Sequence, residues 1–323
     1  MPSSLSWRVP GRPDSQKLRW AILLSLGVLV IPLFVRALSG TPIPFIDDTW
    51  RKFLICLIPG LAAAGCFARA SIAHIDRLAW QAIGIGLASW WIGAIGRTFF
   101  LDVSSGRPVP AWVDFFFLAM YPFVLAGLIL LLRNRLRTYR HLAVFDAVTG
   151  FLLLVSLAFV FFPSQISAMT GHSDFGTVVL ASYPLGDFAL LVVLGSLFRF
   201  SSQPFGGPWS LFGIGILIFV VGDLIFALTT SIDGSVVALL VGIRLVGFIL
   251  VLAGSWRPDE EILEIAPGPA QLLPPLVFLV IAMGALIYGQ ARDLWDAAVV
   301  ALALSIVLVL ARLLATGLEY FRL

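Results

Sequence analysis

The sequence is poor in charge and in the patterns that bind nucleic acid. Charged residues make up 12% of its 323 residues, against about a quarter in an average soluble domain. The formal net charge of +3 comes from few charges, whereas a nucleic-acid surface needs many clustered lysines and arginines with stacking aromatic residues. We therefore expect no nucleic-acid partner, and the composition is unlike that of a soluble globular protein.

Histidine and cysteine are scarce and are not spaced for chemistry. His74, His141 and His172 each lie in or beside an expected loop, and none has the spacing of a metal ligand pair. Cys56 and Cys66 lie ten residues apart on one apolar stretch, which is about 15 Å along a helix and too far for a disulfide. The chain also has no Gly-x-x-x-x-Gly-Lys-Ser/Thr loop and no Gly-x-Ser-x-Gly turn. We expect no catalytic centre, no metal site and no cofactor.

Long apolar runs dominate what is present. The chain is 60% hydrophobic, with a mean hydropathy of +1.01. A helix needs roughly 20 apolar residues to cross a hydrocarbon layer about 30 Å thick. Apolar segments of about this length occur at 18–38, 53–68, 78–95, 112–132, 142–162, 177–198, 209–228, 235–254, 271–288 and 295–315. The sequence predicts an all-α polytopic membrane protein with about ten transmembrane helices.

The basic residues between these segments predict the orientation of the chain. Lysine and arginine accumulate in the short loops on the cytoplasmic side of a membrane. One set of alternate loops and ends carries Arg8, Arg12, Lys17, Arg19, Arg69, Arg77, Arg133, Arg135, Arg137, Arg140, Arg199, Arg257 and Arg322. The other set carries Arg36, Arg51, Lys52, Arg97, Arg107 and Arg292. We therefore expect both termini in the cytoplasm and the chain in the bacterial inner membrane.

An acidic, proline-rich stretch separates the last two segments from the rest. We predict a cytoplasmic N-terminal segment at 1–17, an eight-helix membrane bundle at 18–256, a cytoplasmic connector at 257–270 and a two-helix exit hairpin at 271–323. The helical pattern of the last segment continues past Arg312 and Glu319 to the end of the given sequence. We interpret this helix as a signal exit that leads to an output domain beyond Leu323.

Six of the polar or charged residues inside the expected spans form a candidate cluster. An aspartate or arginine there costs about 2.5 to 3.5 kcal/mol, so each needs a partner or a role. The candidate polar cluster consists of Tyr121, Asp146, Tyr183, Asp187, Asp223 and Arg244. We predict that Arg244 pairs with Asp187 or Asp223, which are nearest to it in depth. Two interpretations of the cluster stay open. It is either a structural ion pair that fixes helix packing, or a polar pocket or charge relay whose state changes when a ligand or a proton binds. Pro122 and Pro184 predict kinks in their helices.

The order of these residues carries a resemblance to a known family. The sequence contains Asp114 with Tyr121-Pro122, then Asp146 after an Arg-rich loop, then Tyr183-Pro184-x-Gly186-Asp187, and then Gly222-Asp223. In these positions residues 112–256 resemble the multi-helix membrane sensory region at the N-terminus of actinobacterial diguanylate cyclases and phosphodiesterases with GGDEF and EAL domains. The third helix departs from the pattern, because it reads Gly93-Ala-Ile-Gly96-Arg97 instead of ending in Gly-Asp. No GGDEF, EAL or HAMP-like segment is present in the given sequence.

The resemblance implies a sensory input module that controls a cyclic-di-GMP output domain. Such a module would respond to an unidentified small ligand or stimulus and would form a homodimer through its last helix. The main alternative is a small-molecule transporter, since ten spans in about 300 residues also resemble the drug/metabolite transporter superfamily. That architecture requires inverted repeats in which helix four resembles helix nine, whereas helix nine has only Pro274-Pro275. A non-catalytic scaffold also stays open, and the lipid bilayer is a partner under every hypothesis.

Overall fold

The computed structural model describes residues 13–73, 75–101, 111–135, 140–161, 174–199, 208–228, 233–256, 273–290 and 296–322. These residues form helices and no strand, and each of the ten predicted apolar segments overlaps one α-helix. The elements are α1 (Pro13–Ser39), η1 (Phe45–Trp50), α2 (Arg51–Ile72), α3 (Arg77–Phe99), α4 (Trp112–Arg135), α5 (Arg140–Phe161), α7 (Asp174–Arg199), α8 (Pro208–Leu228), α9 (Gly234–Ser255), α10 (Leu273–Gln290) and α11 (Asp296–Arg322). The all-α prediction is confirmed for this part of the chain.

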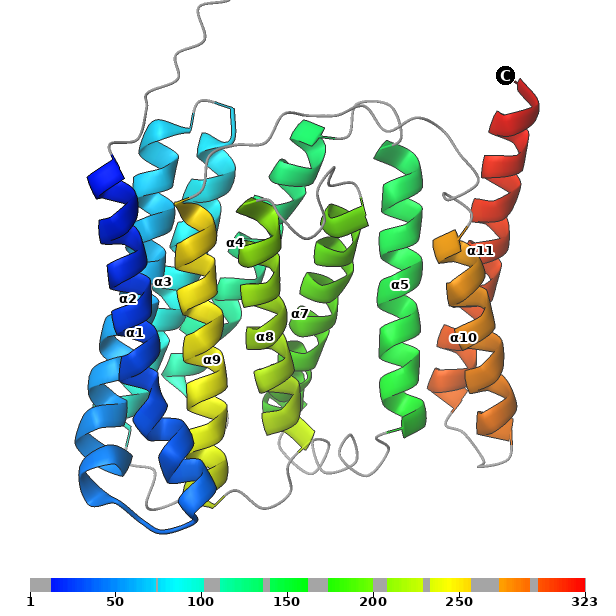
Figure 1. Ribbon diagram of the computed structural model, residues 1–323. Helices are drawn as coiled ribbons and strands as arrows, with labels where there is room; N and C mark the ends of the chain where they lie inside the picture. The colour runs from blue at the N-terminus through cyan, green and yellow to red at the C-terminus, as the bar shows by residue number, and fades with distance from the viewer. Residues whose placement is uncertain are drawn as a thin grey trace, which may run out of the picture.

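The helices have the length and surface expected in a membrane. Within the described residues, six helical stretches are long and apolar enough to cross a bilayer: α1, η1 with α2, α3, α4, α7 and α9. Side chains such as Leu24, Val28 and Ile31 of α1 lie exposed on the outside of the bundle, where lipid is their natural solvent. The start of α1 and the end of α11 lie at the same end of the bundle (Figure 1), as an even number of crossings would require.

The turn after α1 differs from the prediction, which began the second helix at residue 53. Gly40 follows α1 with a φ of +66°, the left-handed conformation in which glycine commonly ends helices. The chain then forms the π-helix η1 and continues directly into α2. The prediction left out residues 45–52 because Asp47, Asp48, Arg51 and Lys52 are charged. One of these charges has a local partner, since the backbone N–H of Ile43 donates to the carboxylate of Asp47 over 3.0 Å. The second helical stretch therefore begins at Phe45.

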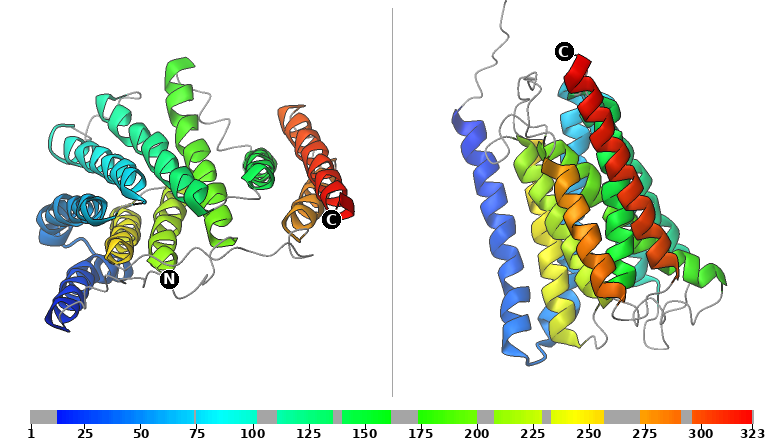
Figure 2. Two further views of the ribbon diagram at one scale, coloured as in Figure 1. Left: turned by 90° about the horizontal axis from the view of Figure 1, so that it is seen from above. Right: turned by 90° about the vertical axis from the view of Figure 1, so that its right-hand side faces the viewer.

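Most of the buried apolar side chains lie inside a ring of helices. Viewed from above, α2, α3, α4, α7, α8 and α9 follow one another around a centre (Figure 2), and each packs against the next, with α9 closing the ring on α2. The main hydrophobic cluster fills this ring with fully buried side chains that include Trp80, Ile83, Leu128, Phe212 and Phe248. Helix α1 lies outside the ring and packs on α9 and α2.

A second hydrophobic cluster joins α5 to the last two helices. It contains Leu153 and Val160 of α5, Ala282 and Ala285 of α10, and Leu302 of α11. Helix α5 also packs against α7 of the ring, so it stands between the ring and the α10–α11 pair (Figure 2). The predicted eight-helix bundle grouped α5 with the ring, whereas its described core contacts also tie it to the predicted exit hairpin.

Glycines let two pairs of neighbouring helices approach closely. A Cβ on Gly247 of α9 would lie 2.7 Å from the carbonyl oxygen of Gly215 on α8, and a Cβ on Gly215 would lie 2.6 Å from the carbonyl oxygen of Gly247. On α3, a Cβ at Gly86 would lie 2.7 Å from Cγ2 of Val124 on α4. Small residues at such crossings are the usual basis of helix packing in membranes. They fix the register of α3 on α4 and of α8 on α9.

Candidate intramembrane polar site

Two tyrosine–aspartate hydrogen bonds join α4 to α7. The hydroxyl of Tyr121 on α4 donates to Oδ1 of Asp187 on α7 over 3.0 Å. The hydroxyl of Tyr183 on α7 donates to Oδ1 of Asp114 on α4 over 2.6 Å. The two rings meet edge to face, with their centroids 6.4 Å apart. We refer to these four residues as the Tyr–Asp ladder.

Helical spacing explains why the ladder forms. Asp114 and Tyr121 are seven residues apart on α4, and Tyr183 and Asp187 are four apart on α7, so each pair lies on one helix face. Asp114 also fixes the start of α4, because its Oδ2 accepts the backbone N–H of Ala111 over 2.7 Å. This contact is half of a capping box, with a carboxylate three residues into the helix satisfying an end N–H. The Tyr183–Asp114 bond of the ladder is thereby attached to the start of α4.

The two Gly-Asp pairs of the sequence act as sockets for side chains from neighbouring helices. A Cβ on Gly186 would overlap the ring of Tyr121, so the glycine seats the ring while Asp187 binds its hydroxyl. A Cβ on Gly222 would lie 3.3 Å from Cγ of Arg244, and the adjacent Asp223 binds the guanidinium of that arginine. In both sockets the glycine provides space and the aspartate provides the polar contact.

The predicted ion pair of Arg244 is confirmed. Nη2 of Arg244 on α9 forms a salt bridge with Oδ1 of Asp223 on α8. Two arginines share one aromatic ring at this point, because the guanidinium carbons of Arg244 and Arg97 lie 5.2 Å and 5.8 Å from the centroid of Phe226. Nε of Arg244 is buried and has no hydrogen-bond partner among the described residues. This donor is one that a water molecule or ligand could satisfy.

The Tyr121–Asp187 bond of the Tyr–Asp ladder and the Arg244–Asp223 ion pair form one electrostatic site. Tyr121 and Asp187 are 5% and 2% exposed. Asp187 lies within electrostatic range of both Asp223 and Arg244 without a hydrogen bond to either. Arg97 lies within range of Asp223. Residues from α3, α4, α7, α8 and α9 therefore contribute charge or a hydroxyl to one region.

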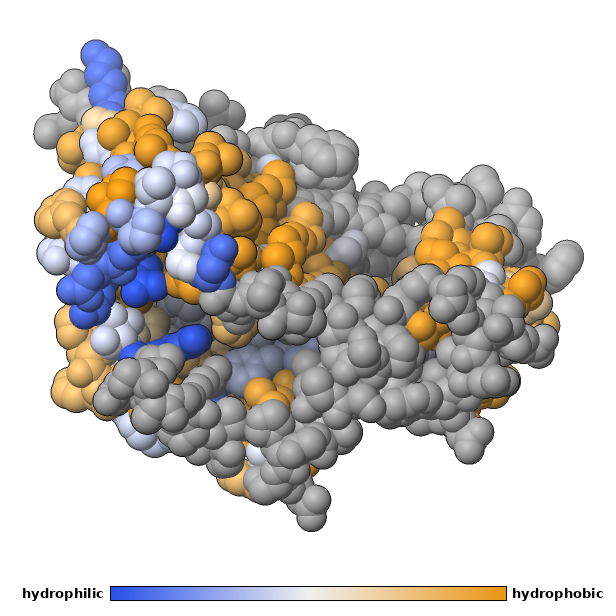
Figure 3. Space-filling model, turned by 90° about the horizontal axis from the view of Figure 1, so that it is seen from below, coloured by the Kyte–Doolittle hydropathy of each residue, from blue (hydrophilic) through white to orange (hydrophobic). Residues whose placement is uncertain are grey.

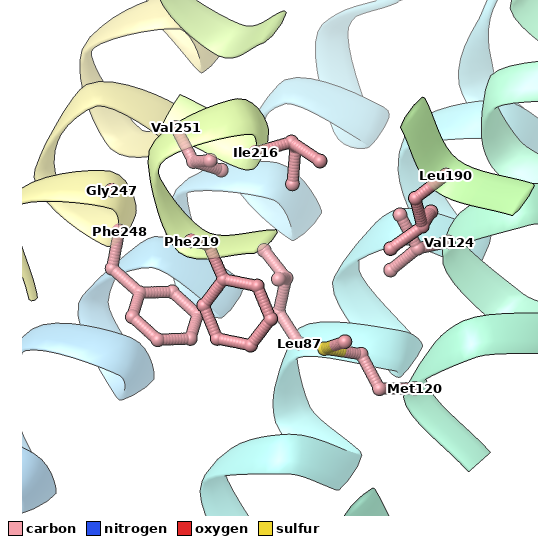
Figure 4. Close-up of a pocket in the computed structure, with 9 residues that line it drawn as sticks. All are labelled: Leu87, Met120, Val124, Leu190, Ile216, Phe219, Gly247, Phe248 and Val251. Atoms are coloured by element: carbon pink, nitrogen blue, oxygen red, sulfur yellow. The ribbon is translucent and has the colours of Figure 1, made fainter. Parts of the chain in front are cut away.

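An apolar cavity lies next to this site in the centre of the ring. It is lined by Leu87, Met120, Val124, Leu190, Ile216, Phe219, Gly247, Phe248 and Val251 (Figure 4). Leu190, Phe219 and Phe248 are three or four residues from Asp187, Asp223 and Arg244, so the cavity is about one helical turn away from the charges. The cavity barely admits a water-sized molecule, and its apolar wall offers that molecule no hydrogen bond.

The structure brings together most of the predicted polar residues. Tyr121, Tyr183, Asp187, Asp223 and Arg244 all belong to the site. The side chains of Asp146, Arg312 and Glu319 lie outside the described residues, although their helices are described. Pro122 and Pro184 lie inside α4 and α7, which continue through them, and the expected kinks stay predictions. Helix α11 runs on to Arg322, through Gly317.

Sequence reasoning missed some contributors to the site. Asp114 was part of the family resemblance but was left out of the candidate cluster, although its spacing from Tyr121 places both on one face of α4. Arg97 was counted only as a loop charge, and Phe226 had no distinguishing signal. The space that Gly186 and Gly222 provide could not be inferred, because it depends on which side chain of another helix lies opposite.

A separate buried ion pair lies at the opposite end of the bundle from the start of α1 and the end of α11. Arg36 is 3% exposed and its Nε lies 2.8 Å from Oδ2 of Asp47, while its Nη1 donates to Oγ of Ser235 over 3.0 Å. It links α1, η1 and the start of α9. Figure 3 views this end of the molecule, where hydrophilic side chains gather mainly on the side of α1 and η1. The sequence analysis treated Arg36 as a topology signal and missed its structural role.

The polar site brings acids, phenols and guanidinium cations together. Among the described residues, no group of three or more histidine, cysteine or acidic side chains could hold a metal ion. The site instead combines three carboxylates, two phenols and two guanidiniums. Comparison with protein-family models, with curated proteins and with solved structures finds no match to this chain.

Proposed function

We propose that this chain is a membrane-embedded sensory input module that passes the state of its polar site to the last helix, α11. The observation that carries the proposal is the position of α5. A Cβ on Gly150 of α5 would lie 3.4 Å from Cγ2 of Val192 on α7 and 3.3 Å from the ring of Phe278 on α10. One side of α5 thus contacts the helix that bears Asp187, and α5 also packs against α11.

This path supports signalling because a packed helix transmits movement. The interiors of proteins are close-packed, so a displaced helix moves its neighbours instead of deforming them. A change at the Tyr121–Asp187 bond would shift α7 relative to α4, and α5 would carry that shift to α10 and α11. The resemblance of residues 112–256 to the sensory regions of GGDEF and EAL proteins supports cyclic-di-GMP as the output. The inner membrane, a homodimer through α11 and an unidentified stimulus belong to this proposal.

The packing gives less support to a transporter of the drug/metabolite type. In its inverted repeats, α4 and α10 would be counterparts, as the fourth and ninth helices, and so would α3 and α9. Helix α4 lies in the central ring, whereas α10 lies at the periphery beside α11 (Figure 2). Helix α3 packs against α4, but α9 is separated from α10 by several helices (Figure 1). The described helices therefore lack the related halves that such a transporter needs.

The function can be tested with a diguanylate cyclase domain joined in helical register after Leu323. Replacing Tyr121 with phenylalanine removes the hydroxyl that binds Asp187, and we expect cellular cyclic-di-GMP to change about fivefold or more. Inserting two glycines after Arg312 should abolish that difference, because two adjacent glycines add flexibility well beyond that of the single Gly317 already in α11. Two alanines at the same position are the control, since they change length and register equally but preserve the helix.

Two outcomes would contradict the signalling proposal. Equal cyclic-di-GMP with and without the Tyr121 hydroxyl, at equal amounts of membrane protein, would show that the polar site does not control the output. A response that survives the two glycines would show that α11 is only a tether.

The proposed topology predicts which residues can be reached from outside the inner membrane. In a chain with Cys56 and Cys66 replaced by alanine, we expect a membrane-impermeant maleimide to label Thr41→Cys on spheroplasts. Ile75→Cys, at the other end of the bundle, should react only after the membrane is permeabilised. Both positions are exposed, so burial does not protect either thiol. The reverse labelling pattern would overturn the orientation.

A further inference from the structure

Asp187 is a buried carboxylate that has no ion-pair partner among the described side chains. It is 2% exposed and lies within the apolar stretch of α7 from Phe175 to Gly195. Its one hydrogen-bond partner among the described residues is the neutral hydroxyl of Tyr121. An ionised carboxylate in such surroundings is strongly unfavourable unless a positive charge neutralises it.

The cation that acts on Asp187, Arg244, is already paired with another carboxylate. Arg244 forms a salt bridge with Asp223, and Arg97 lies over the same Phe226 ring and within electrostatic range of Asp223. Asp223 therefore has two cations near it, whereas Asp187 shares Arg244 at longer range and also faces the like charge of Asp223. The charges at the site are divided unequally between the two aspartates.

The other helices that pack against α7 place no described cation beside Asp187, since Arg133 of α4 is exposed and lies twelve residues beyond Tyr121. Helix α4 contributes Tyr121 and Asp114, of which Asp114 accepts from Tyr183. Helix α8 contributes Asp223. On α5, the titratable residues Arg140, His141 and Asp146 have side chains outside the described residues.

We propose that Asp187 is a proton-binding site and that its protonation is the input to the module. The second part rests on the proposed sensory function, whereas proton binding does not. A hydronium ion transfers its proton to the carboxylate, which gives a neutral carboxylic acid and a water molecule. Tyr121 can keep donating to Oδ1 while the new proton resides on Oδ2. A metal cation fits poorly, because one carboxylate and one phenol cannot supply the six or more oxygen ligands that hard cations take.

Protonation would change the contact between α4 and α7. A hydrogen bond to an ionised acceptor is about twice as strong as a neutral one, so the Tyr121–Asp187 bond weakens when Asp187 takes up a proton. The repulsion between Asp187 and Asp223 disappears in the same step. Both changes act on α7 at Asp187, five residues before Val192, where α7 contacts α5.

Infrared spectroscopy of the purified full chain in lipid vesicles tests the site directly. We expect a protonated-carboxyl C=O band that changes in intensity between about pH 5 and pH 9, within the range where perturbed carboxyl groups titrate. The Asp187→Asn variant should lose this band and should fold, because asparagine is close in shape to the neutral acid. Asp48→Asn, which changes an exposed carboxylate of η1, should keep it. Tyr121→Phe should shift the band to higher frequency, because the carbonyl loses its hydrogen bond.

The outcomes separate this inference from the proposed function. A titrating band that persists in Asp187→Asn, or the absence of any such band in the parent chain, would overturn the proton site. A band whose intensity follows sodium concentration instead of pH would also overturn it. If the band behaves as expected but cyclic-di-GMP from the cyclase fusion ignores pH, the proton site stands and its role as the input fails.

Discussion

Replacing Arg244 with methionine should lower the free energy of unfolding by about 3 kcal/mol. The substitution leaves the half-buried Asp223 carboxylate in its socket without the guanidinium that binds it. We expect the lower end of the range for broken buried pairs, because the pair is only partly buried and Arg97 remains within electrostatic range of Asp223. Thermal unfolding in detergent, followed by the fraction that stays monodisperse on size exclusion, measures the effect.

A double variant distinguishes the lost pair from lost packing. Arg244→Met combined with Asp223→Leu replaces the pair by apolar side chains, which is often neutral or stabilising at buried sites. We expect the double variant to recover most of the stability. Lys52→Met is the control, because the Lys52–Asp48 pair is exposed and such pairs contribute about 0 to 1 kcal/mol. Destabilisation that is simply additive in the double variant would contradict the pairing energy.

Placing alanine at Gly186 should lower the free energy of unfolding by about 1 to 3 kcal/mol. The new methyl group would overlap the ring of Tyr121, which must move and lose its bond to Asp187. The matched control is Gly195→Ala on the same helix, where a Cβ meets nothing within 4 Å. There we expect no loss of stability and a gain of up to about 1 kcal/mol from helix propensity.

The socket can also be tested by compensation. Tyr121→Ala removes the ring that the Gly186 methyl group meets, so Gly186→Ala should cost much less in that background than in the parent chain. Non-additivity of about 1 kcal/mol or more is expected for residues in direct contact. Equal costs in both backgrounds would show that the glycine does not seat the ring.

The relation between sequence and site is clearest at the two Gly-Asp pairs. The aspartates could be identified from the sequence, because a charged residue inside an apolar segment is costly and needs a partner. The same cost led to the correct expectation that Arg244 pairs with one of two aspartates. Depth along the helices could not choose between Asp187 and Asp223, since both lie near the level of Arg244. Only the packing of α8 against α9 made Asp223 the partner.

The sequence by itself determined the helical class, the position of the apolar segments and most of the polar residues that needed partners. These properties follow from local composition, since the bilayer requires long apolar helices whatever their neighbours are. The tertiary structure decided that Gly186 seats Tyr121, that Asp114 completes the ladder, and that α5 stands between the ring and α11. Each of these contacts joins helices far apart in the chain. Helix register and neighbour choice depend on the packing of whole surfaces, which no single segment encodes.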